Sequence, residues 1–246
     1  MNYLWACLPH CYVVNLPRRS DRRSTIEASL PPELSVSFTS DWLGPFDGQE
    51  LTLNQLNRDG YGLFPWRIDS PNPWWSRPLK YGEIGCALSH LRCWQEIARS
   101  GLQTAIILED DAVLAPGFLT RLVEGLPSAL QHCDLLYLGR VPQEPDRGYR
   151  DDFAVPGYSH CTYGYLLTQH AAQQLVSSGL DDALIPVDEF LPAMYLDHPR
   201  PDVRCHFPPR LRALAFEPPL VSQLPKHLAG SDTEDNEFVF DRPSAG

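Results

Sequence analysis

Short apolar runs alternate with amphipathic stretches along most of the chain. Five runs are candidate strands: Tyr12–Leu16, Thr104–Leu108, Asp134–Leu138, Tyr163–Thr168 and Arg212–Phe216. Each is short and mostly apolar, as expected for a strand that is buried on both faces of a parallel sheet. The segments between them show helical periodicity. This β–α–β order predicts an α/β fold in which helices flank a mainly parallel sheet.

The clearest predicted helix spans Glu83–Arg99, where apolar residues recur at helical spacing. Further helices are expected after Ser20 or Asp21 as N-cap, over Phe118–Leu126, over His170–Ser178 before Gly179, and from Asp188 to about Leu196. Residues 38–78 lack this periodicity and are rich in Trp, Pro, Gly and Asn. They predict a long loop region of functional interest.

The length of 246 residues suits one large domain. We expect a single domain over residues 1–230, followed by a mobile acidic tail over residues 231–246. The apolar segment Met1–Val14 has no early basic residue and runs into the first strand. It is therefore interpreted as part of the domain and not as a signal peptide. No apolar run approaches the length of a membrane span.

The net charge and the cysteine pattern indicate which binding partners and which cellular compartment to expect. The formal net charge of -11 argues against electrostatic binding to nucleic acid or to anionic membranes. The seven cysteines form no CxxC pair and show no zinc-like spacing. They are expected to be buried free thiols in a reducing compartment, which predicts a cytoplasmic protein.

The most informative feature is the acidic triplet Glu109-Asp110-Asp111, which follows the Thr104–Leu108 run directly. Ligands of open α/β sheets bind beyond the carboxyl ends of the strands. Three adjacent carboxylates there repel one another unless a positive group neutralises them. Mg²⁺ or Mn²⁺ would serve, because these ions bind carboxylate and phosphate oxygens. A solvated acidic turn is the alternative interpretation.

A basic cluster follows the first candidate strand. Its members are Arg18, Arg19, Arg22 and Arg23, four of the 20 basic residues of the chain. The planar guanidinium group suits phosphate, so these residues could hold a diphosphate beside the cation. Arg18 and Arg22 are the preferred candidates. A solvated helix start would explain at least two of the four.

Several segments resemble glycosyltransferase family 25. The segment Val13–Arg22 resembles its opening strand, Asp47-Gly48 a short motif, Gly82–His90 its most recognisable segment and Leu108–Asp111 its metal motif. The segments Leu136–Arg140, Pro186–Pro192, His198-Pro199, Ala215–Pro218 and Ser231–Glu234 resemble the catalytic domain of procollagen galactosyltransferases. The resemblance covers nearly the whole chain. It implies a GT-A-like, Rossmann-like fold and an inverting transfer of galactose, or glucose, from a UDP-sugar with Mn²⁺ or Mg²⁺.

The resemblance also implies residue roles. Asp111 is the first choice as metal ligand, with Glu109 and the late His227 as further ligands. Glu109 and Asp110 could also contact the donor. The other expected substrate-binding residues lie in the matching motifs: Asn15, Leu16, Arg18, Arg22, Asp47, Gly82, Glu83 and Ser89.

An inverting transfer also needs a base for the acceptor hydroxyl. Asp188 and Glu189 follow Pro186 at the start of a helix, where amides and the helix dipole orient a carboxylate. One of them is expected to be the base, although Asp188 could simply cap the helix. His90 is interpreted as a packed helix residue or as a neighbour of the ligands. Trp74 and Trp75 could stack on a sugar or acceptor, or could merely be packed.

The acceptor stays open between hydroxylysine of a collagen-like protein and a sugar of lipooligosaccharide. Eukaryotic collagen-modifying enzymes have two glycosyltransferase-like domains, an entry signal and a retention tail, whereas this sequence shows one domain and ends in Arg242–Gly246. A non-catalytic glycosyltransferase-like module that binds nucleotide sugars is the alternative function. Together, Glu109, Asp111, Asp188, Glu189 and His227 favour the enzyme.

Overall fold

The computed structural model describes residues 8–42, 46–150 and 152–240. Within these residues, an eight-stranded sheet has the order β2-β1-β3-β8-β5-β9-β7-β6. Its strands are β1 (His10–Val14), β2 (Val36–Phe38), β3 (Thr104–Glu109), β5 (Leu135–Pro142), β6 (Arg147–Arg150), β7 (Phe153–Val155), β8 (Ser159–Thr168) and β9 (Ala213–Phe216). The predicted strands are confirmed, and the short strands β2, β6 and β7 are additional.

Most strands of this sheet point in one direction. β1 is parallel to both β2 and β3, and β5 is parallel to β9. β8 lies between β3 and β5 and is antiparallel to both, and β7 is antiparallel to β9. The mainly parallel α/β sheet is therefore confirmed, with two reversed strands. Reversal of β8 brings its first residues, not its last, to the edge where β1 and β3 end.

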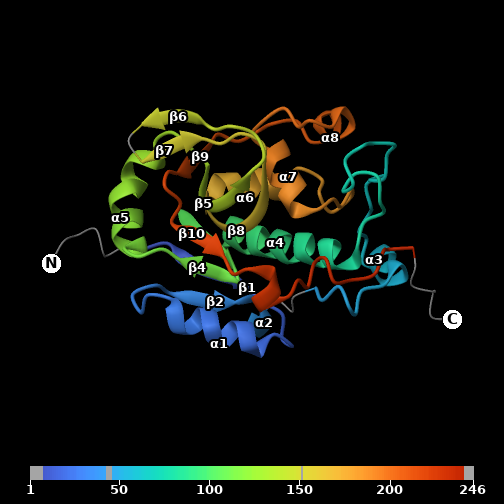
Figure 1. The fold of residues 1–246 in the computed structure, drawn as a ribbon, viewed down its shortest axis with the longest axis horizontal. Helices are drawn as coiled ribbons and strands as arrows, with labels where there is room; N and C mark the ends of the chain where they lie inside the picture. Colours follow the sequence, from blue (N-terminus) through green and yellow to red (C-terminus); the bar gives the residue numbers. More distant parts are fainter. Residues whose placement is uncertain (1–7, 43–45, 151, 241–246) are drawn as a thin grey trace.

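Helices cover both faces of the sheet (Figure 1). One core cluster contains apolar residues of α4 (Tyr81–Ser100), α6 (Gln169–Val176) and α7 (Val187–Ala193), and the other contains those of α1 (Ser20–Ser29) and α5 (Phe118–Ala129). β3 contributes Ala105 and Ile107 to the first cluster and Ile106 and Leu108 to the second. This alternation explains the unbroken apolar run of the strand. The arrangement forms a single layered domain, consistent with a GT-A-like fold.

The predicted helix over Glu83–Arg99 is confirmed, and its ends have local causes. The Glu83 carboxylate accepts a hydrogen bond from the Lys80 amide at 2.8 Å, so the helix begins at Tyr81. Gly101, with φ 74°, ends it in the left-handed conformation that glycine adopts readily. The expected helices near residues 20, 118, 170 and 188 are also present.

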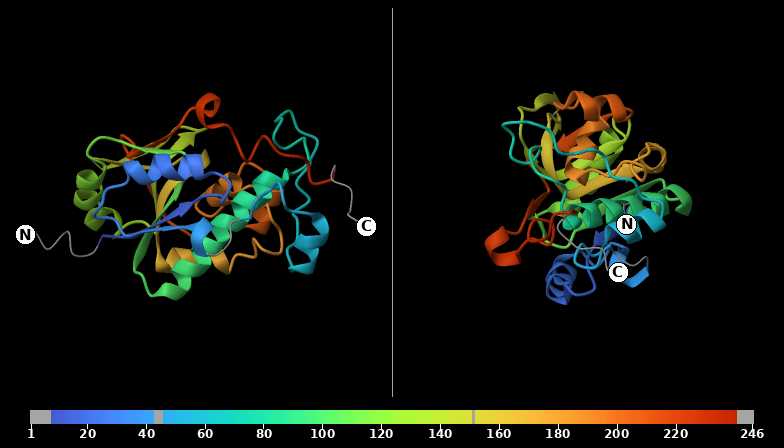
Figure 2. Two further views of the ribbon diagram at one scale, coloured as in Figure 1. Left: turned by 90° about the horizontal axis from the view of Figure 1, so that it is seen from below. Right: turned by 90° about the vertical axis from the view of Figure 1, so that its right-hand side faces the viewer.

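The predicted loop region over residues 38–78 is partly wrong, because it contains α2 (Thr39–Trp42) and α3 (Leu53–Arg58). Thr52 caps α3 by accepting a hydrogen bond from the Gln55 amide. The stretch from α3 to α4 is largely irregular, and Figure 2 shows it curling around the side of the molecule that carries α7 and α8 (Pro201–His206). Arg200 fastens it there by donating a hydrogen bond to the Trp66 carbonyl at 2.7 Å.

The C-terminal segment packs against α4, although the sequence analysis expected a mobile tail. The two-stranded sheet of β4 (Ala112–Leu114) and β10 (Val221–Gln223) leads into α9 (Lys226–Ala229). The Tyr81 amide then donates to the Glu237 carbonyl at 3.0 Å, and Val239 is 1% exposed. Figure 1 shows this segment, in red, running beside α4. Residues 241–246 of the expected tail and residues 1–7 of the expected N-terminal part of the domain lie outside the described residues.

The described residues bear on two expectations, the state of the cysteines and the presence of a membrane span. Their six cysteines carry free thiols: Cys11, Cys93 and Cys133 are buried, Cys86 and Cys161 are half-buried, and Cys205 is exposed. Cys7 lies outside the described part of the chain. None of the described helices combines the length and the apolar composition needed to cross a membrane.

Candidate active site

The three acidic residues lie where β3 ends, and each has a different environment. Asp110 is 6% exposed and fully engaged. Asn15 Nδ2 donates to its Oδ2 at 2.8 Å, and Arg22 Nη1 donates to its Oδ1 at 2.9 Å. Burial raises the pKa of Asp110, although Asn15 and Arg22 favour its charged form. Asp110 therefore links the end of β3 to Asn15, which follows β1, and to Arg22 of α1. It does not line the cavity described below.

Asp111 has an unsatisfied oxygen. Gln223 Nε2 donates to its Oδ2 at 3.1 Å, whereas Oδ1 is buried without a hydrogen-bond partner among the described residues. Burial, followed by the negative charge of Glu109, raises the pKa of Asp111 to about 7. A buried, unpaired carboxylate oxygen beside a second carboxylate is the environment that a divalent cation would neutralise.

Glu109 faces the cavity at the last position of β3. Thr162 Oγ1 donates to its Oε1 at 2.6 Å, and His90 Nε2 lies 3.4 Å from the same oxygen. Burial opposes ionisation, but His90 and Thr162 outweigh it and lower the pKa of Glu109. Thr162 reaches this carboxylate because β8 runs antiparallel to β3.

Asp188 and Glu189 occupy the first turn of α7 but differ in their contacts. Both oxygens of Glu189 accept hydrogen bonds: Oε1 from Trp75 Nε1 at 3.0 Å, and Oε2 from the Tyr158 hydroxyl at 2.6 Å. His198 Nε2 also donates to Oε2 at 2.9 Å, since its Nδ1 accepts from the Arg200 amide. Burial raises the pKa of Glu189, but these donors prevail and lower it.

No side-chain hydrogen bond to Asp188 is found among the described residues. The Cys161 amide is directed at its carboxylate. Burial, followed by the charges of Glu189, Glu83 and Glu109, raises the pKa of Asp188 to about 7. Cys161 itself has φ 65°, a strained conformation for a residue with a side chain, where the pairing of β5 and β8 is irregular. Asp188 is thus the less engaged carboxylate of the pair.

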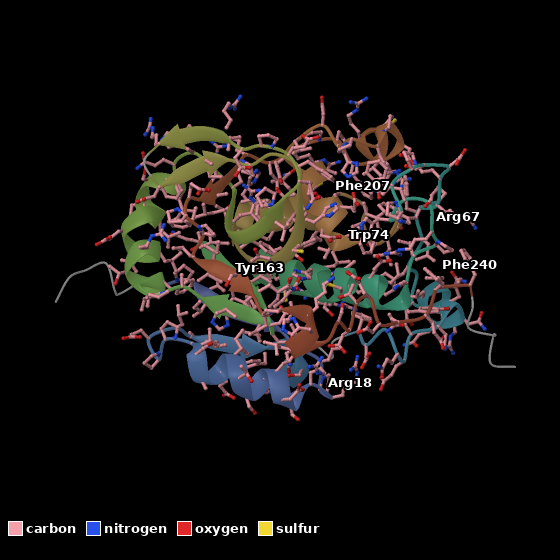
Figure 3. All side chains as sticks on the ribbon, viewed as in Figure 1. Arg18, Arg67, Trp74, Tyr163, Phe207 and Phe240 are labelled. Atoms are coloured by element: carbon pink, nitrogen blue, oxygen red, sulfur yellow. The ribbon has the colours of Figure 1, made fainter. Side chains whose placement is uncertain are left out.

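These carboxylates line one cavity. Glu109, Asp111, Asp188 and Glu189 border it together with Arg22 and residues 230–234, and Trp66, Trp74, Val141 and His160 line it as well. The cavity is therefore acidic on one side and aromatic on another. Figure 3 labels Trp74 and Arg18, which lie on opposite sides of α4 in that view.

The predicted phosphate-binding arginines already contact carboxylates. Arg18 Nε donates to Asp47 Oδ2 at 2.6 Å, and its Nη1 lies 2.7 Å from Asp232 Oδ1. Arg22 is 8% exposed and binds Asp110. Its Nη2 donates at 2.9 Å to the carbonyls of Ala229 and Gly230. Arg22 reaches the cavity, whereas Arg18 is absent from the residues that line it.

Other expected substrate-binding residues form contacts with residues around the site. Ser89 Oγ accepts from the Phe46 amide at 3.3 Å, and Glu83 forms an ion pair with Arg77 at 2.5 Å. Glu83 also borders the cavity, but Leu16, Asp47, Gly82 and Ser89 do not. A Cβ atom on Gly82 would lie 2.5 Å from the Asp232 carbonyl oxygen, so glycine permits the C-terminal segment to approach α4.

His227 lies on α9, is exposed, and is absent from the cavity lining. Its role as a metal ligand stays a prediction. Trp75 hydrogen-bonds Glu189 and lines no part of the cavity, whereas Trp74 does. Four neighbours of the acidic residues were not predicted from the sequence: Thr162, Gln223, Lys226 and Asp232. Asp232 alone had a sequence signal, as part of the motif Ser231–Glu234.

Comparisons with known proteins show the family of this chain. A family profile described as glycosyltransferase family 25 (LPS biosynthesis protein) matches residues 8–145. The chain is 35% identical over 249 residues to procollagen galactosyltransferase 1 of Danio rerio, and 34% identical over 248 residues to procollagen galactosyltransferase 2 of Homo sapiens. It is also 35% identical over 236 residues to inactive glycosyltransferase 25 family member 3 of Homo sapiens.

These matches cover 93%, 93% and 91% of this chain, respectively, but only 40%, 38% and 38% of the relatives. The chain thus spans about two fifths of the length of the curated relatives it matches. The profile match covers more than half of the chain and includes β1, α4 and the acidic triplet. The chain therefore belongs to glycosyltransferase family 25.

Proposed function

We propose that this chain is a metal-dependent glycosyltransferase that transfers galactose, or glucose, from a UDP-sugar to an acceptor hydroxyl with inversion. The observation that carries the proposal is the position of Asp188. No side chain among the described residues hydrogen-bonds its carboxylate, and it lines the same cavity as Glu109 and Asp111. This reaction requires a base and a pair of carboxylates that can bind a cation, both in one cavity.

Asp188 is the proposed base, and Glu189 the positioning residue beside it. An acceptor hydroxyl would transfer its proton to the Asp188 carboxylate while the sugar passes to the hydroxyl oxygen and UDP leaves. A base works best when its pKa lies near the working pH, which agrees with the raised pKa of Asp188. Glu189 keeps its charge through Trp75, Tyr158 and His198, and that charge favours a proton on Asp188.

The unsatisfied Oδ1 of Asp111 fits a cation. Asp111 and Glu109 would hold Mn²⁺ or Mg²⁺, and His227 is the further ligand expected from the sequence. When bound, the cation would supply a counter-charge for the diphosphate of the departing UDP. Arg22, which lines the same cavity, would contribute a second positive charge.

The acceptor would enter past Trp66 and Trp74, whose rings could stack on a saccharide or an aliphatic side chain. Hydroxylysine of a collagen-like protein and a lipooligosaccharide sugar are the two acceptor classes proposed. The first follows from the names of the animal relatives, and the second from the association of the family with LPS biosynthesis. A cytoplasmic location is part of the proposal for the saccharide acceptor.

A non-catalytic module that binds nucleotide sugars is the second candidate, because one human relative is named as inactive. UDP release distinguishes the two. The protein would be incubated with Mn²⁺ and UDP-galactose or UDP-glucose, with either hydroxylysine peptides or lipooligosaccharide. The enzyme should release UDP only when donor and acceptor are both present, and Asp188→Asn should lack this release. Donor binding without acceptor-dependent release in either case would support the module.

A further inference from the structure

Cys86 and His90 lie one helical turn apart on α4 and face the end of β3. The sulfur of Cys86, a ring nitrogen of His90 and a carboxylate oxygen of Glu109 all lie within 4.8 Å of one another. This is the one such triad of His, Cys, Asp and Glu side chains found among the described residues. It differs from the acidic triplet, because it offers one sulfur, one nitrogen and one oxygen.

The histidine of this triad carries an unsatisfied atom. His90 is 0% exposed, and in the part of the chain that the structure describes no group forms a hydrogen bond with its buried Nε2. The distance of 3.4 Å from Nε2 to Glu109 Oε1 exceeds the usual N–H···O range. Two ligands of one tetrahedral Zn²⁺, each about 2.0–2.1 Å from the ion, lie about 3.3–3.4 Å apart. The observed separation therefore suits two ligands of a shared cation.

The other ring nitrogen of His90 is already held. His90 Nδ1 lies 2.7 Å from the Tyr165 hydroxyl, which also accepts a hydrogen bond from Trp94 Nε1 at 2.9 Å. The hydroxyl oxygen has two lone pairs and can accept from both rings. With a cation bound, Nδ1 would carry the proton and the Nε2 lone pair would face the ion, whereas without it a proton on Nε2 accounts for the effect of His90 on the pKa of Glu109. Histidine ligands of metals are commonly oriented in this way by a partner on the second nitrogen.

An ion could reach the triad from the cavity, because Cys86 and Glu109 both line it. Glu83, Asp111 and Asp188 line the same cavity, and their negative charges would attract a cation. Thiolate and imidazole ligands select Zn²⁺ or Co²⁺, whereas carboxylates and water suit Mg²⁺ and Mn²⁺. The triad and Asp111 would thus prefer different ions, although both would use Glu109.

We propose that Cys86, His90 and Glu109 form a binding site for a thiophilic divalent cation such as Zn²⁺. The Cys86 thiol loses its proton to solvent when the sulfur–metal bond forms, and the fourth position is open to water from the cavity. Zn²⁺ at this site would engage Glu109 and oppose the proposed glycosyl transfer. The binding site itself does not depend on the proposed function.

Titration of the metal-free protein with Co²⁺ alone tests the site, since a cobalt–thiolate bond produces a near-ultraviolet charge-transfer band. The parent protein should develop this band and the visible spectrum of tetrahedral Co²⁺, and Zn²⁺ should abolish both. Cys86→Ser should remove the charge-transfer band and weaken Zn²⁺ binding by more than the about 10- to 100-fold that loss of an outer-shell partner costs. Serine is close in size to cysteine, so the fold should persist, and thermal melting verifies this.

Cys161→Ser is the matched control, because Cys161 lines the same cavity but is not a member of the triad. Its charge-transfer band should equal that of the parent. Asp111→Asn should also keep the band while losing the Mn²⁺ dependence of UDP binding, which separates the two sites. A parent without the band, or a band that survives in Cys86→Ser, would overturn the proposal. His90 would then donate from Nε2 and merely orient Glu109.

Discussion

Asp232 and Arg18 form an ion pair with 2.7 Å between Oδ1 and Nη1. Asp232 Oδ2 also lies 2.5 Å from Arg19 Nη1 and 3.6 Å from Arg22 Nη1. A protein carboxylate thus occupies the basic cluster that the sequence assigns to a diphosphate. Donor phosphates and Asp232 would compete for the same guanidinium groups.

We therefore predict that Asp232→Asn strengthens UDP binding by about 1.4- to fivefold, since a partly exposed ion pair contributes about 0.2–1 kcal/mol. Calorimetry with UDP and Mn²⁺ measures this. Asp235→Asn is the control, because this substitution removes the same charge nearby. Asp235 accepts a hydrogen bond from the Ser231 amide. Weaker UDP binding in Asp232→Asn alone would show that the carboxylate assists the donor site.

Gly82→Ala should displace the C-terminal segment from α4. The added Cβ would lie 2.5 Å from the Asp232 carbonyl oxygen and 2.6 Å from that of Thr233. Such crowding costs about 1–3 kcal/mol, which lowers Tm by roughly 2–10 °C in a chain of this size. Gly148→Ala is the matched control, because no described residue lies within 4 Å of its added Cβ. Equal Tm values for the two variants would refute the close approach.

Asp111→Asn should abolish the metal dependence of UDP binding and of turnover. In the absence of metal, we expect the variant to be more stable than the parent at alkaline pH. The folded-state pKa of about 7 lies above the ordinary value of 3.8, so the folded protein holds a proton that the unfolded chain loses. Stability is then lost as the pH rises from about 4 to about 7. Asparagine does not ionise, so the variant does not lose this stability and should melt at a higher temperature than the parent at pH 8.

The same variant supplies its own control at pH 4, where Asp111 is neutral in the folded parent. Parent and variant should melt at similar temperatures there. If the metal-free parent is the more stable protein at pH 8, the Asp111 carboxylate has a favourable partner and is a weaker candidate for the cation.

Asp188→Asn and Glu189→Gln should separate base from positioning residue. Loss of a general base lowers kcat by about 10²–10⁴-fold. Because burial raises the pKa of Asp188 as it raises that of Asp111, its amide should not lower Tm, and it should raise Tm at pH 8 in the absence of metal. Glu189→Gln weakens hydrogen bonds from Trp75, Tyr158 and His198, so it should lower Tm. If instead Glu189→Gln abolishes kcat with an unchanged Tm, and Asp188→Asn is active, the roles are reversed.

Turnover should rise with pH. Asp188 must be ionised to accept a proton, and its pKa is raised to about 7 without metal. The rate should therefore fall as the pH is lowered from above 7 into the acidic range. A bound cation would move the midpoint to lower pH by stabilising the carboxylate. The pH dependence of kcat, measured from pH 5 to pH 9, checks this, and a rate that falls toward alkaline pH would contradict it.

Much of the fold could be predicted from the sequence because the signals are local. The apolar run Thr104–Leu108 and the helical periodicity of Glu83–Arg99 each depend on residues close together in the chain. The direction of β8 could not be predicted in this way. Antiparallel β8 pairs with β3 and β5 at the centre of the sheet, where its residues are buried on both faces like those of a parallel strand.

The site was predicted less completely, for a related reason. Glu109, Asp111 and Asp188 do share a cavity, as the strand ends and the helix start suggested. The partners that distinguish them come from distant elements: Gln223 reaches Asp111, Thr162 reaches Glu109, and Tyr158 reaches Glu189. Side-chain contacts of this kind leave no periodicity in the sequence. Arg18 and Arg22 matched a phosphate site by residue type, but their carboxylate partners depend on the folded chain.

The contact between Asp232 and the arginines after β1 has a consequence for biosynthesis. Synthesis begins at the N-terminus, so α1 and its arginines leave the ribosome long before the residue that neutralises them. Domains generally fold as units during synthesis, and this charge balance requires residues 229–232, more than 200 positions after the arginines. Until residues 229–232 follow, Arg18, Arg19 and Arg22 lack partners that they have in the folded domain. Nascent chains that stall before this point would expose a basic surface that the finished protein conceals.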